Sequence, residues 1–463
     1  METKIDHTIQ YGQTLKRHSE YKYTKVIQNT GGDDLVIGAS TQSSTFEIPV
    51  VGFNLAKSRI NFIQNIPAAA HYTAAFRHTP PWSRVELFTR GGTYLMDVTN
   101  FSHIYTAFGQ RTKKIEDFHG DETGIITKSI PAPAAFGTPI PAAAGDPATG
   151  AEFDAAVTRL NAVSDSVTVA LQSSSELQLR MNQLSTDAGD LSVRWSIKGS
   201  ELYNTIMSLD KTLILGEVLN LRITWLQNAA HGFTSDDGLG ATNPANITNN
   251  VSINKLAVYL AQESNASVLQ DLSNVISTDG MQFLIPYTHA YKTTLPRNTT
   301  SHAISVRLSR GHGISLARIY TLFGSGAEEK QTRYEAKLST ASPVVTGPRS
   351  FYSLLNSRRV QEFDIDVEAL DYDWMKTGEK KDRVVSLSIG NDQRLFAHSD
   401  GWAGTDLESS KSQEMVGLSL AVEQKYDLYV NRGATAAAAD ANYYTAAVCQ
   451  KQLMVGPGGV QVM

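Results

Sequence analysis

The stretch LSVRWSIKGSELYNTIMSLDKTLILGEVLNLRITW, residues 191–225, decides the fold class expected for this chain. Two runs within it alternate apolar with polar residues: Leu191, Val193, Trp195 and Ile197, then Leu221, Ile223 and Trp225. This period of two is typical of a strand with one dry face and one wet face. Between the runs, Leu202, Ile206 and Leu209 keep helical spacing behind Ser200 as a helix N-cap. The stretch therefore predicts strand, short helix, strand.

The same alternation recurs through the later half of the chain. It covers Leu256/Val258/Leu260, Ile304/Val306/Leu308, Phe363/Ile365/Val367, Val385/Leu387/Ile389 and Val416/Leu418/Leu420/Val422. Strands that are buried on one face favour antiparallel sheets packed face to face, because parallel sheets covered on both sides give continuous apolar runs. The pattern predicts an all-β chain built from β-sandwiches.

Helices are expected to be few and short. Helical spacing occurs in Phe101, Ile104, Tyr105 and Phe108, and again in Leu269, Leu272 and Ile276. In the second case Ser267 and Gln270 occupy capping-box positions, which predicts a helix that starts there.

Length and composition set the limits of the interpretation. The 463 residues exceed the ~250–300 at which one hydrophobic core usually stops growing, so two bodies are expected. Hydrophobic residues make up 41% and charged residues 19%, which is an ordinary globular balance. A net charge of −5 gives no reason to expect strong direct binding to nucleic acid. One cysteine, and an N-terminus without an apolar signal segment, indicate synthesis in a reducing compartment.

Composition along the chain predicts five parts. They are an N-terminal arm at 1–34, a first sandwich at 35–230, a linker at 231–250, a second sandwich at 251–455 and a C-terminal tail at 456–463. Within the first sandwich, residues 129–151 are rich in Pro and Ala and predict an exposed loop. The arm lacks periodicity, so we expect it to become ordered against a partner.

Enzymatic motifs are incomplete throughout. No Gly-Lys pair exists for a phosphate-binding loop, and Ser325 lies between glycines without the nucleophile elbow around it. His71 and His78 are seven residues apart in expected strand or loop, which fits ordinary histidines better than zinc ligands. We therefore assign no catalytic, cofactor-binding or metal-binding residue and expect a protein that is not an enzyme.

An acidic row is the strongest candidate for a charged site. Glu362, Asp364, Asp366 and Glu368 alternate with apolar residues, so four carboxylates share one face of an expected strand. Such a row could bind calcium or supply an acid/base pair, but a solvated strand face explains it better. The basic segments 356–359 and 376–383 lie nearby and favour a salt-bridged contact over catalysis.

Three segments resemble one known family. SELYNTIMSLDKTLILGEVLNLRITW (200–225), VELFTRGGTYLMDVTN (85–100) and SFYSLLNSRRVQEFDI (350–365) are similar to segments of double jelly-roll major capsid proteins from polinton-like viruses, virophages and adintovirus-like relatives. The similarity in order and pattern extends over most of residues 40–455. The Pro/Ala-rich loop and the acidic row have no counterpart in it.

The resemblance implies a fold and a function. The fold is two consecutive eight-stranded jelly rolls (a double jelly roll) with a few short helices and long loops. Three chains would form a homotrimer of six sandwiches around a pseudo-sixfold axis, the capsomer of an icosahedral DNA-virus capsid. Its partners would be neighbouring capsomers, penton proteins and minor capsid proteins, and contact with an inner membrane is left open. The protein would be made in the host cytoplasm or nucleus and reside in the virion.

Two other functions remain open at this point. One is a minor virion protein or spike of the same fold. The other is a carbohydrate-binding or glycan-active sandwich, in which Trp82, Trp225 or Trp402 would stack on sugars and the carboxylates of 362–373 would act.

Overall fold

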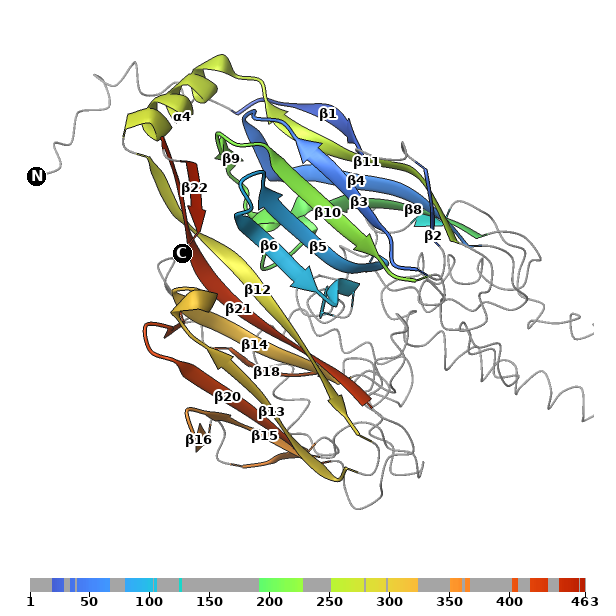
Figure 1. Cartoon of the computed structure of the whole chain (residues 1–463), viewed down its shortest axis with the longest axis vertical. Coiled ribbons are helices and arrows are strands. Elements are labelled where there is room, and N and C mark those ends of the chain that lie inside the picture. The colour runs from blue at the N-terminus through green and yellow to red at the C-terminus, as the bar shows by residue number, and fades with distance from the viewer. Residues whose placement is uncertain are drawn as a thin grey trace, which may run out of the picture.

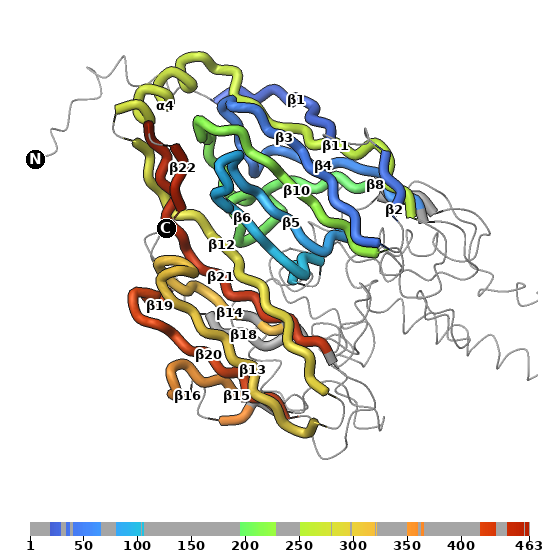
Figure 2. The backbone as a smooth tube through the Cα atoms, viewed as in Figure 1, coloured from blue at the N-terminus to red at the C-terminus, as the bar shows by residue number. Residues whose placement is uncertain are grey.

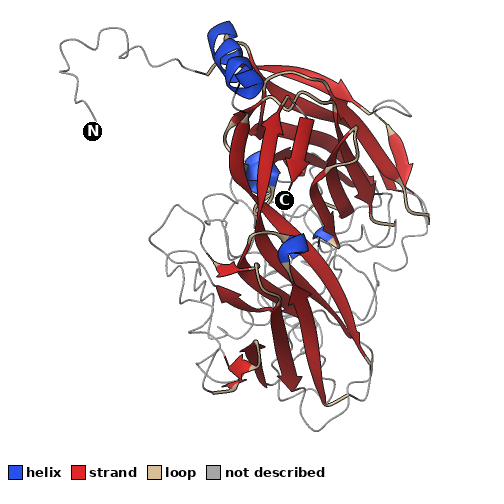
Figure 3. Cartoon of the chain, turned by 60° about the vertical axis from the view of Figure 1, so that its left-hand side comes forward, coloured by secondary structure: helices blue, strands red, loops and turns tan. Residues whose placement is uncertain are grey.

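Strands dominate the computed structural model of the chain (Figure 3). The described residues are 19–28, 34–37, 40–66, 80–102, 104–105, 125–126, 191–227, 251–278, 280–296, 299–323, 350–359, 363–366, 402–406, 417–431, 441–457 and 459–462. Four antiparallel sheets form two sandwiches, which lie side by side in Figure 1. The all-β prediction and the prediction of two sandwiches are confirmed.

The first sandwich consists of sheets A and B. Sheet A has the order β1-β11-β4-β8-β7, with β2 paired to β11 and β9 paired to β4. Its strands are β1 (Tyr21–Ile27), β2 (Leu35–Ile37), β4 (Phe53–Ile66), β7 (Ile125–Ile126), β8 (Leu191–Lys198), β9 (Thr212–Leu213) and β11 (Val251–Glu263). Sheet B has the order β3-β10-β5-β6. Its strands are β3 (Ser43–Ile48), β5 (Trp82–Thr89), β6 (Tyr94–Thr99) and β10 (Leu219–Trp225).

The second sandwich consists of sheets C and D. Sheet C has the order β12-β21-β14-β18, with β19 paired to β14 and β22 paired to β21. Its strands are β12 (Met281–Leu295), β14 (Ser315–Phe323), β18 (Trp402–Asp406), β19 (Leu418–Ser419), β21 (Ala441–Gly456) and β22 (Gly459–Val462). Sheet D has the order β13-β20-β15-β16, with β17 paired to β15. Its strands are β13 (Ser301–Leu308), β15 (Ser350–Leu355), β16 (Arg358–Arg359), β17 (Ile365–Asp366) and β20 (Gln424–Asn431).

The two sandwiches have the same strand order. If the main strands of each are numbered along the chain, one sheet runs first-last-third-sixth and the other runs second-seventh-fourth-fifth. In this numbering β1 corresponds to β12, β11 to β21, β6 to β16 and β8 to β18. The correspondence holds although no residue-level repeat links the halves.

Strand β21 is buried on both faces, unlike the strands whose alternation is visible in the sequence. Tyr443, Ala447 and Cys449 point into the core between sheets C and D. Tyr444, Ala446 and Val448 alternate with them and join the core of the first sandwich instead. Two-sided burial produces the nearly continuous apolar run YYTAAVC, so the sequence has no alternation there to indicate a strand.

Three predicted boundaries are wrong. Tyr21–Ile27 was assigned to the arm, but it forms β1 and pairs with β11 from Tyr21↔Glu263 to Ile27↔Ala257. Val251–Glu263 was assigned to the second sandwich, but it is the last strand of the first because it also pairs with β4. Gly459–Val462 was assigned to the tail, but it pairs with β21 as β22. The chain passes between the sandwiches at α4 (Ala266–Thr278), at the top of Figure 2.

Most strands predicted from alternation are present. Alternation correctly identified β8, β10, β11 and β13. Among the described residues of 363–367 and 416–422, only Ile365–Asp366 (β17) and Leu418–Ser419 (β19) form strands. Val422 is exposed in a turn, so the last apolar position of that pattern is not part of a strand. Residues 385–389 lie outside the described residues.

The predicted helices are partly correct. Phe101, Ile104 and Tyr105 are helical and buried. In 200–209 the chain forms the 3₁₀ turns η4 (Gly199–Glu201) and η5 (Ile206–Ser208) instead of a helix, because Asn204 between them has φ +57°. Helix α4 is present, but the Asn265 Oδ1 accepts a hydrogen bond from the Ser267 N–H, so Ser267 is not the N-cap.

Candidate functional site

Few of the residues considered for chemistry lie in the described part of the chain. His71, His78, Ser325, the loop 129–151 and the linker 231–250 lie outside it. Where the structure describes side chains, no three His, Cys, Asp or Glu residues gather closely enough to hold a metal ion. No helix in the same ranges has the length and apolar character needed to span a bilayer.

The acidic row is described only in its centre. Ile365–Asp366 forms β17 and pairs with β15, while Glu362 and Glu368 lie outside the described residues. Asp364 is exposed and forms an ion pair with Arg359 of β16. This ion pair joins the acidic row to the basic segment 356–359 of the same chain. It is a salt-bridged contact, formed within one chain.

Two of the three tryptophans considered as sugar platforms are fully buried. Trp82 and Trp225 lie in the first core, with ring centroids 6.3 Å apart, and Trp225 meets Phe62 edge to face at 5.1 Å. The Trp225 Nε1–H donates to the Ser44 hydroxyl at 3.0 Å. Neither ring can stack on a ligand, and the Trp402 side chain lies outside the described residues.

The junction between the sandwiches joins an edge of one to an edge of the other. Strand β6 at the edge of sheet B lies beside β12 at the edge of sheet C (Figure 1). Leu95 of β6 is fully buried in the same apolar cluster as Ala446 and Val448 of β21. The Thr288 hydroxyl of β12 donates to the Asn204 carbonyl at 2.9 Å. Apolar packing and hydrogen bonding together fix one sandwich against the other.

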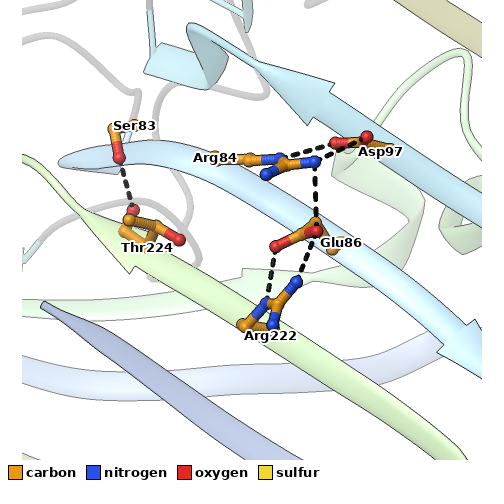
Figure 4. Close-up of polar contacts among 6 residues, drawn as sticks. All are labelled: Ser83, Arg84, Glu86, Asp97, Arg222 and Thr224. Atoms are coloured by element: carbon orange, nitrogen blue, oxygen red, sulfur yellow. Dashed lines mark hydrogen bonds and ion pairs between the residues drawn. The ribbon is translucent and has the colours of Figure 1, made fainter.

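A charged network crosses sheet B next to this junction (Figure 4). The Glu86 carboxylate accepts two hydrogen bonds from Arg222, at 2.6 and 2.7 Å, and lies 3.2 Å from Arg84. Arg84 in turn donates twice to Asp97, at 2.8 Å each. Glu86 is only 1% exposed, whereas both arginines are more than a third exposed. Three strands are therefore tied together by paired charges on the outer face of the sheet.

The two arginines are held more firmly protonated by their carboxylate partners. Hydrogen bonding to Asp97 raises the pKa of Arg84, and hydrogen bonding to Glu86 raises the pKa of Arg222. Both arginines therefore stay protonated over the whole physiological pH range.

His289 on β12 is a partly buried titratable group. Its Nε2–H donates to the His312 carbonyl at 2.8 Å, and its ring lies 4.8 Å from that of Tyr287. Burial lowers the pKa of His289 to about 4, and the nearby Lys451 charge acts in the same direction. Burial also lowers the pKa of Lys451 itself. His289 is therefore neutral at pH 7.

No described element packs on the outer face of sheet A, whereas the first sandwich covers that of sheet C. A row of directly opposed residues crosses the outer face of sheet A from β1 to β8, consisting of Lys25, Tyr259, Arg59 and Lys198. On β1, Tyr23 is 57% exposed and Ile27 is 52% exposed. Tyr259 and Arg59 in this row, together with the exposed Tyr23, are of the residue types enriched at protein interfaces.

Sheet D also has an open outer face with stacked aromatic rings. The rings of Tyr352 and Tyr429 stack at 4.8 Å between centroids and 7° between planes. The guanidinium of Arg359 lies 4.2 Å from the centre of the Tyr352 ring. Tyrosine and arginine are the side chains enriched at the energetic centres of protein interfaces. Within the described part of the chain, the molecule is thus a fixed pair of sandwiches with one uncovered face at each end.

Two solved structures that match the chain in fold over nearly its whole length are viral capsid proteins. The crystal structure of the mavirus major capsid protein matches with a TM-score of 0.50 and 9% identity, over 100% of this chain and 96% of that one. The quasi-atomic model of the PBCV-1 virus capsid matches with a TM-score of 0.50 and 10% identity, over 97% of this chain and 98% of that one. The chain has a double jelly-roll fold. No protein-family model and no curated protein sequence matches it.

The fold comparison agrees with the strand order found within the chain. Both jelly rolls of this chain are complete enough to show all eight main strands, and the matches extend over nearly the whole length of both partners. The predicted resemblance to double jelly-roll major capsid proteins is confirmed at the level of the fold.

Sequence reasoning missed the charged network. Arg84 and Glu86 alternate with apolar residues in SRVELF, and Arg222 does so in LNLRITW, so each could be placed on a wet strand face. Their pairing depends on the register Arg222↔Glu86 between β10 and β5, which are more than a hundred residues apart. Alternation shows on which face of the sheet a residue lies, but it does not show which residue of the neighbouring strand lies opposite.

Proposed function

We propose that this protein is a viral major capsid protein that self-assembles into homotrimeric capsomers and, through them, into an icosahedral shell. The observation that supports the proposal is the double jelly roll itself, matched over 97–100% of the chain by the mavirus and PBCV-1 capsid proteins. In this role the protein is structural and not an enzyme. Its place is the virion, after synthesis in the host cell.

The geometry of the chain suits this role. Two like sandwiches joined in a fixed orientation form two of the six sides that a pseudo-hexagonal capsomer needs. A contact between unlike faces of identical subunits closes into a ring when its rotation allows closure. Obligate interfaces of such rings commonly bury ~2,000–5,000 Å², which can supply durability without disulfides.

The first test is the native mass and outline of the purified full-length chain. We expect a particle of three times 50.5 kDa by light scattering, with a pseudo-hexagonal outline in negative-stain images. A chain that stays monomeric at high concentration contradicts the proposal. Copy number in purified particles separates a major capsid protein from a minor virion protein or spike of the same fold.

The N-terminal residues provide a second test. We propose that residues 1–18 act as an arm that contacts neighbouring capsomers, minor capsid proteins or penton proteins. Deleting residues 1–18 is expected to leave trimers intact and impair shell formation. Deleting residues 1–30 would also remove β1 from sheet A and is expected to reduce folding, so it serves as the comparison. Normal shells from the shorter deletion would contradict the role of the arm.

A further inference from the structure

The two sandwiches share one topology, so each strand of one sandwich has a counterpart in the other. Two strands that meet at the junction therefore define a second contact, between their two counterparts. Strand β6 meets β12 at the junction within the chain. The counterpart of β6 in the second sandwich is β16, because both are the fifth main strand and the edge of their sheet. The counterpart of β12 in the first sandwich is β1, because both are the first strand and the edge of theirs. The counterpart contact would therefore join β16 to β1.

Within one chain this counterpart contact is impossible. Strand β1 lies at the upper right of the molecule and β16 at the lower left, at opposite ends of the two sandwiches (Figure 1). A second copy of the chain is the partner that can bring a β16 edge to β1. Repeating the junction this way makes a contact between unlike surfaces, which is the kind that builds closed rings.

Exposure of the two counterparts fits an unused interface. Val36 of β2, which continues the edge of β1 along β11, is exposed as Tyr23 and Ile27 are. These are three of the exposed large hydrophobic side chains of the described residues, and they lie along one edge. At the other end Arg358 and Arg359 of β16 are exposed. By contrast, Leu95 of β6 is fully buried at the junction that is already formed.

The outer faces of sheets C and A also differ in burial. The outer face of sheet C has Tyr444, Ala446 and Val448, which the first sandwich covers. The outer face of sheet A has Tyr259 and Ile63, each only partly buried, among polar and basic residues. Tyrosine and arginine next to exposed apolar side chains are typical of the centre of a protein interface.

We infer that the open face of sheet A, along β1 and β2, is the seam that receives the β15–β16 edge of sheet D from a second copy. The inference rests on the proposed function, because it assigns the surfaces that close the capsomer. Each copy uses one open face at each end, and the seam repeats the junction between its own two sandwiches.

The first test is a pair of charge insertions on β1. The double variant Tyr23→Asp/Ile27→Asp places two carboxylates on exposed positions, so the chain is expected to fold with an unchanged melting temperature. Its trimer is expected to be lost at concentrations where the wild-type chain is wholly trimeric. The matched control is Val50→Asp, since Val50 is 48% exposed in the turn between β3 and β4 and lies on neither counterpart strand. That control is expected to remain trimeric.

The second test is cross-linking through introduced cysteines. The natural Cys449 is buried, and burial raises its pKa to about 12, so it gives little background with thiol reagents at neutral pH. In the variant Lys25→Cys/Arg358→Cys, a bifunctional thiol reagent is expected to yield covalent dimers and trimers. Neither single variant is expected to cross-link, because the seam joins unlike surfaces.

The outcomes separate this inference from the proposed function. Trimers that survive the Asp insertions and give no cross-links overturn the seam and leave the capsid role intact. Cross-linking of Lys25→Cys alone means that two β1 edges meet, which also overturns the seam. A wild-type chain that stays monomeric overturns the proposed function and the seam with it.

Discussion

Sheet A and sheet C have the same strand order but face different surroundings. From Lys57 to Asn65 on β4 in sheet A, buried residues alternate with exposed or partly exposed ones, so one face is buried and the other faces solvent. On β21 in sheet C, Tyr443 and Tyr444 are neighbours in sequence, point to opposite faces and are both buried. The first sandwich covers the outer face of sheet C, and nothing in the described part of this chain does the same for sheet A.

This difference shows how one topology serves two roles. Burying the outer face of sheet C makes the two sandwiches one rigid block, since close-packed apolar contacts resist small shifts. The open face of sheet A retains a surface for another molecule. The junction within the chain therefore shows which kind of contact is missing at its open faces.

Replacing Ala446 of β21 by Asp tests whether the outer face of sheet C is dry. Ala446 is buried in the junction, so Ala446→Asp places an unpaired charge in an apolar cluster. The expected cost is about 4 kcal/mol or more, enough to prevent folding in most expression conditions. Urea unfolding followed by tryptophan fluorescence, or the soluble yield, measures it.

The matched change on sheet A is Asn61→Asp. Asn61 lies on the outer face of β4, and its Oδ1 accepts from the Ser196 hydroxyl at 2.9 Å, which a carboxylate can also do. We expect the unfolding free energy to change by about 0.5 kcal/mol or less. Equal costs for the two variants would show that sheets A and C have equivalent outer faces.

Replacing Glu86 by Gln compares the charged networks of sheets B and D. Glu86→Gln removes the charge that Arg222 and Arg84 share beside the junction. Breaking a buried pair costs ~3–5 kcal/mol, but solvent screens the partly exposed arginines, so we expect about 2 kcal/mol. Chemical denaturation of the variant at pH 7 measures the loss.

The corresponding variant on sheet D is Asp364→Asn. It removes the ion pair with Arg359, in which both side chains are exposed. Surface pairs contribute ~0–1 kcal/mol, so a loss below that of Glu86→Gln is expected. High salt should reduce the smaller effect further, because it screens exposed charges. A larger loss of stability for Asp364→Asn than for Glu86→Gln would contradict the solvent exposure of the ion pair at the edge of sheet D.

The sequence predicts strands well where burial is one-sided and poorly elsewhere. The alternation in LNLRITW identifies β10, because its apolar residues are buried and its polar residues are partly exposed. Strand β21 has no alternation because both faces are buried. Strand β1 is the opposite case: none of its residues is fully buried, so the sequence pattern there resembles an arm.

Boundaries and contacts depend on distant parts of the chain and so escape local patterns. Val251–Glu263 follows a long polar segment and looks like the start of a new body, yet it returns to pair with β1 and β4. The double jelly roll itself could be predicted from the resemblance of three segments. The junction could not, because the packing of β6 on β12 leaves no spacing signal in either strand.

An effect similar in size to that of Glu86→Gln is expected on the pH dependence of stability, and it arises in sheet C. His289 has a pKa of about 4 in the folded chain and about 6.5 when unfolded. As pH falls from 6.5 to 4, the unfolded chain therefore binds a proton that the folded chain does not, and the folded state loses stability. Below pH 4 both states are protonated and the loss stops growing. We expect the total to be about 2 kcal/mol, reduced from the full shift because the side chain is only partly buried.

The variant His289→Gln keeps a donor for the His312 carbonyl and cannot titrate. Relative to the wild type, its stability should fall less between pH 6.5 and 4, while carboxylates contribute equally to both proteins. The groups that act on His289 are Lys451 of β21, His312 of η8 (Arg310–His312) and Asp97 of β6, and none of them is changed. The control His302→Gln alters a histidine of β13 outside this group. If His289→Gln and the wild type lose the same stability between pH 6.5 and 4, the folded chain does not lower the pKa of His289, and the prediction is wrong.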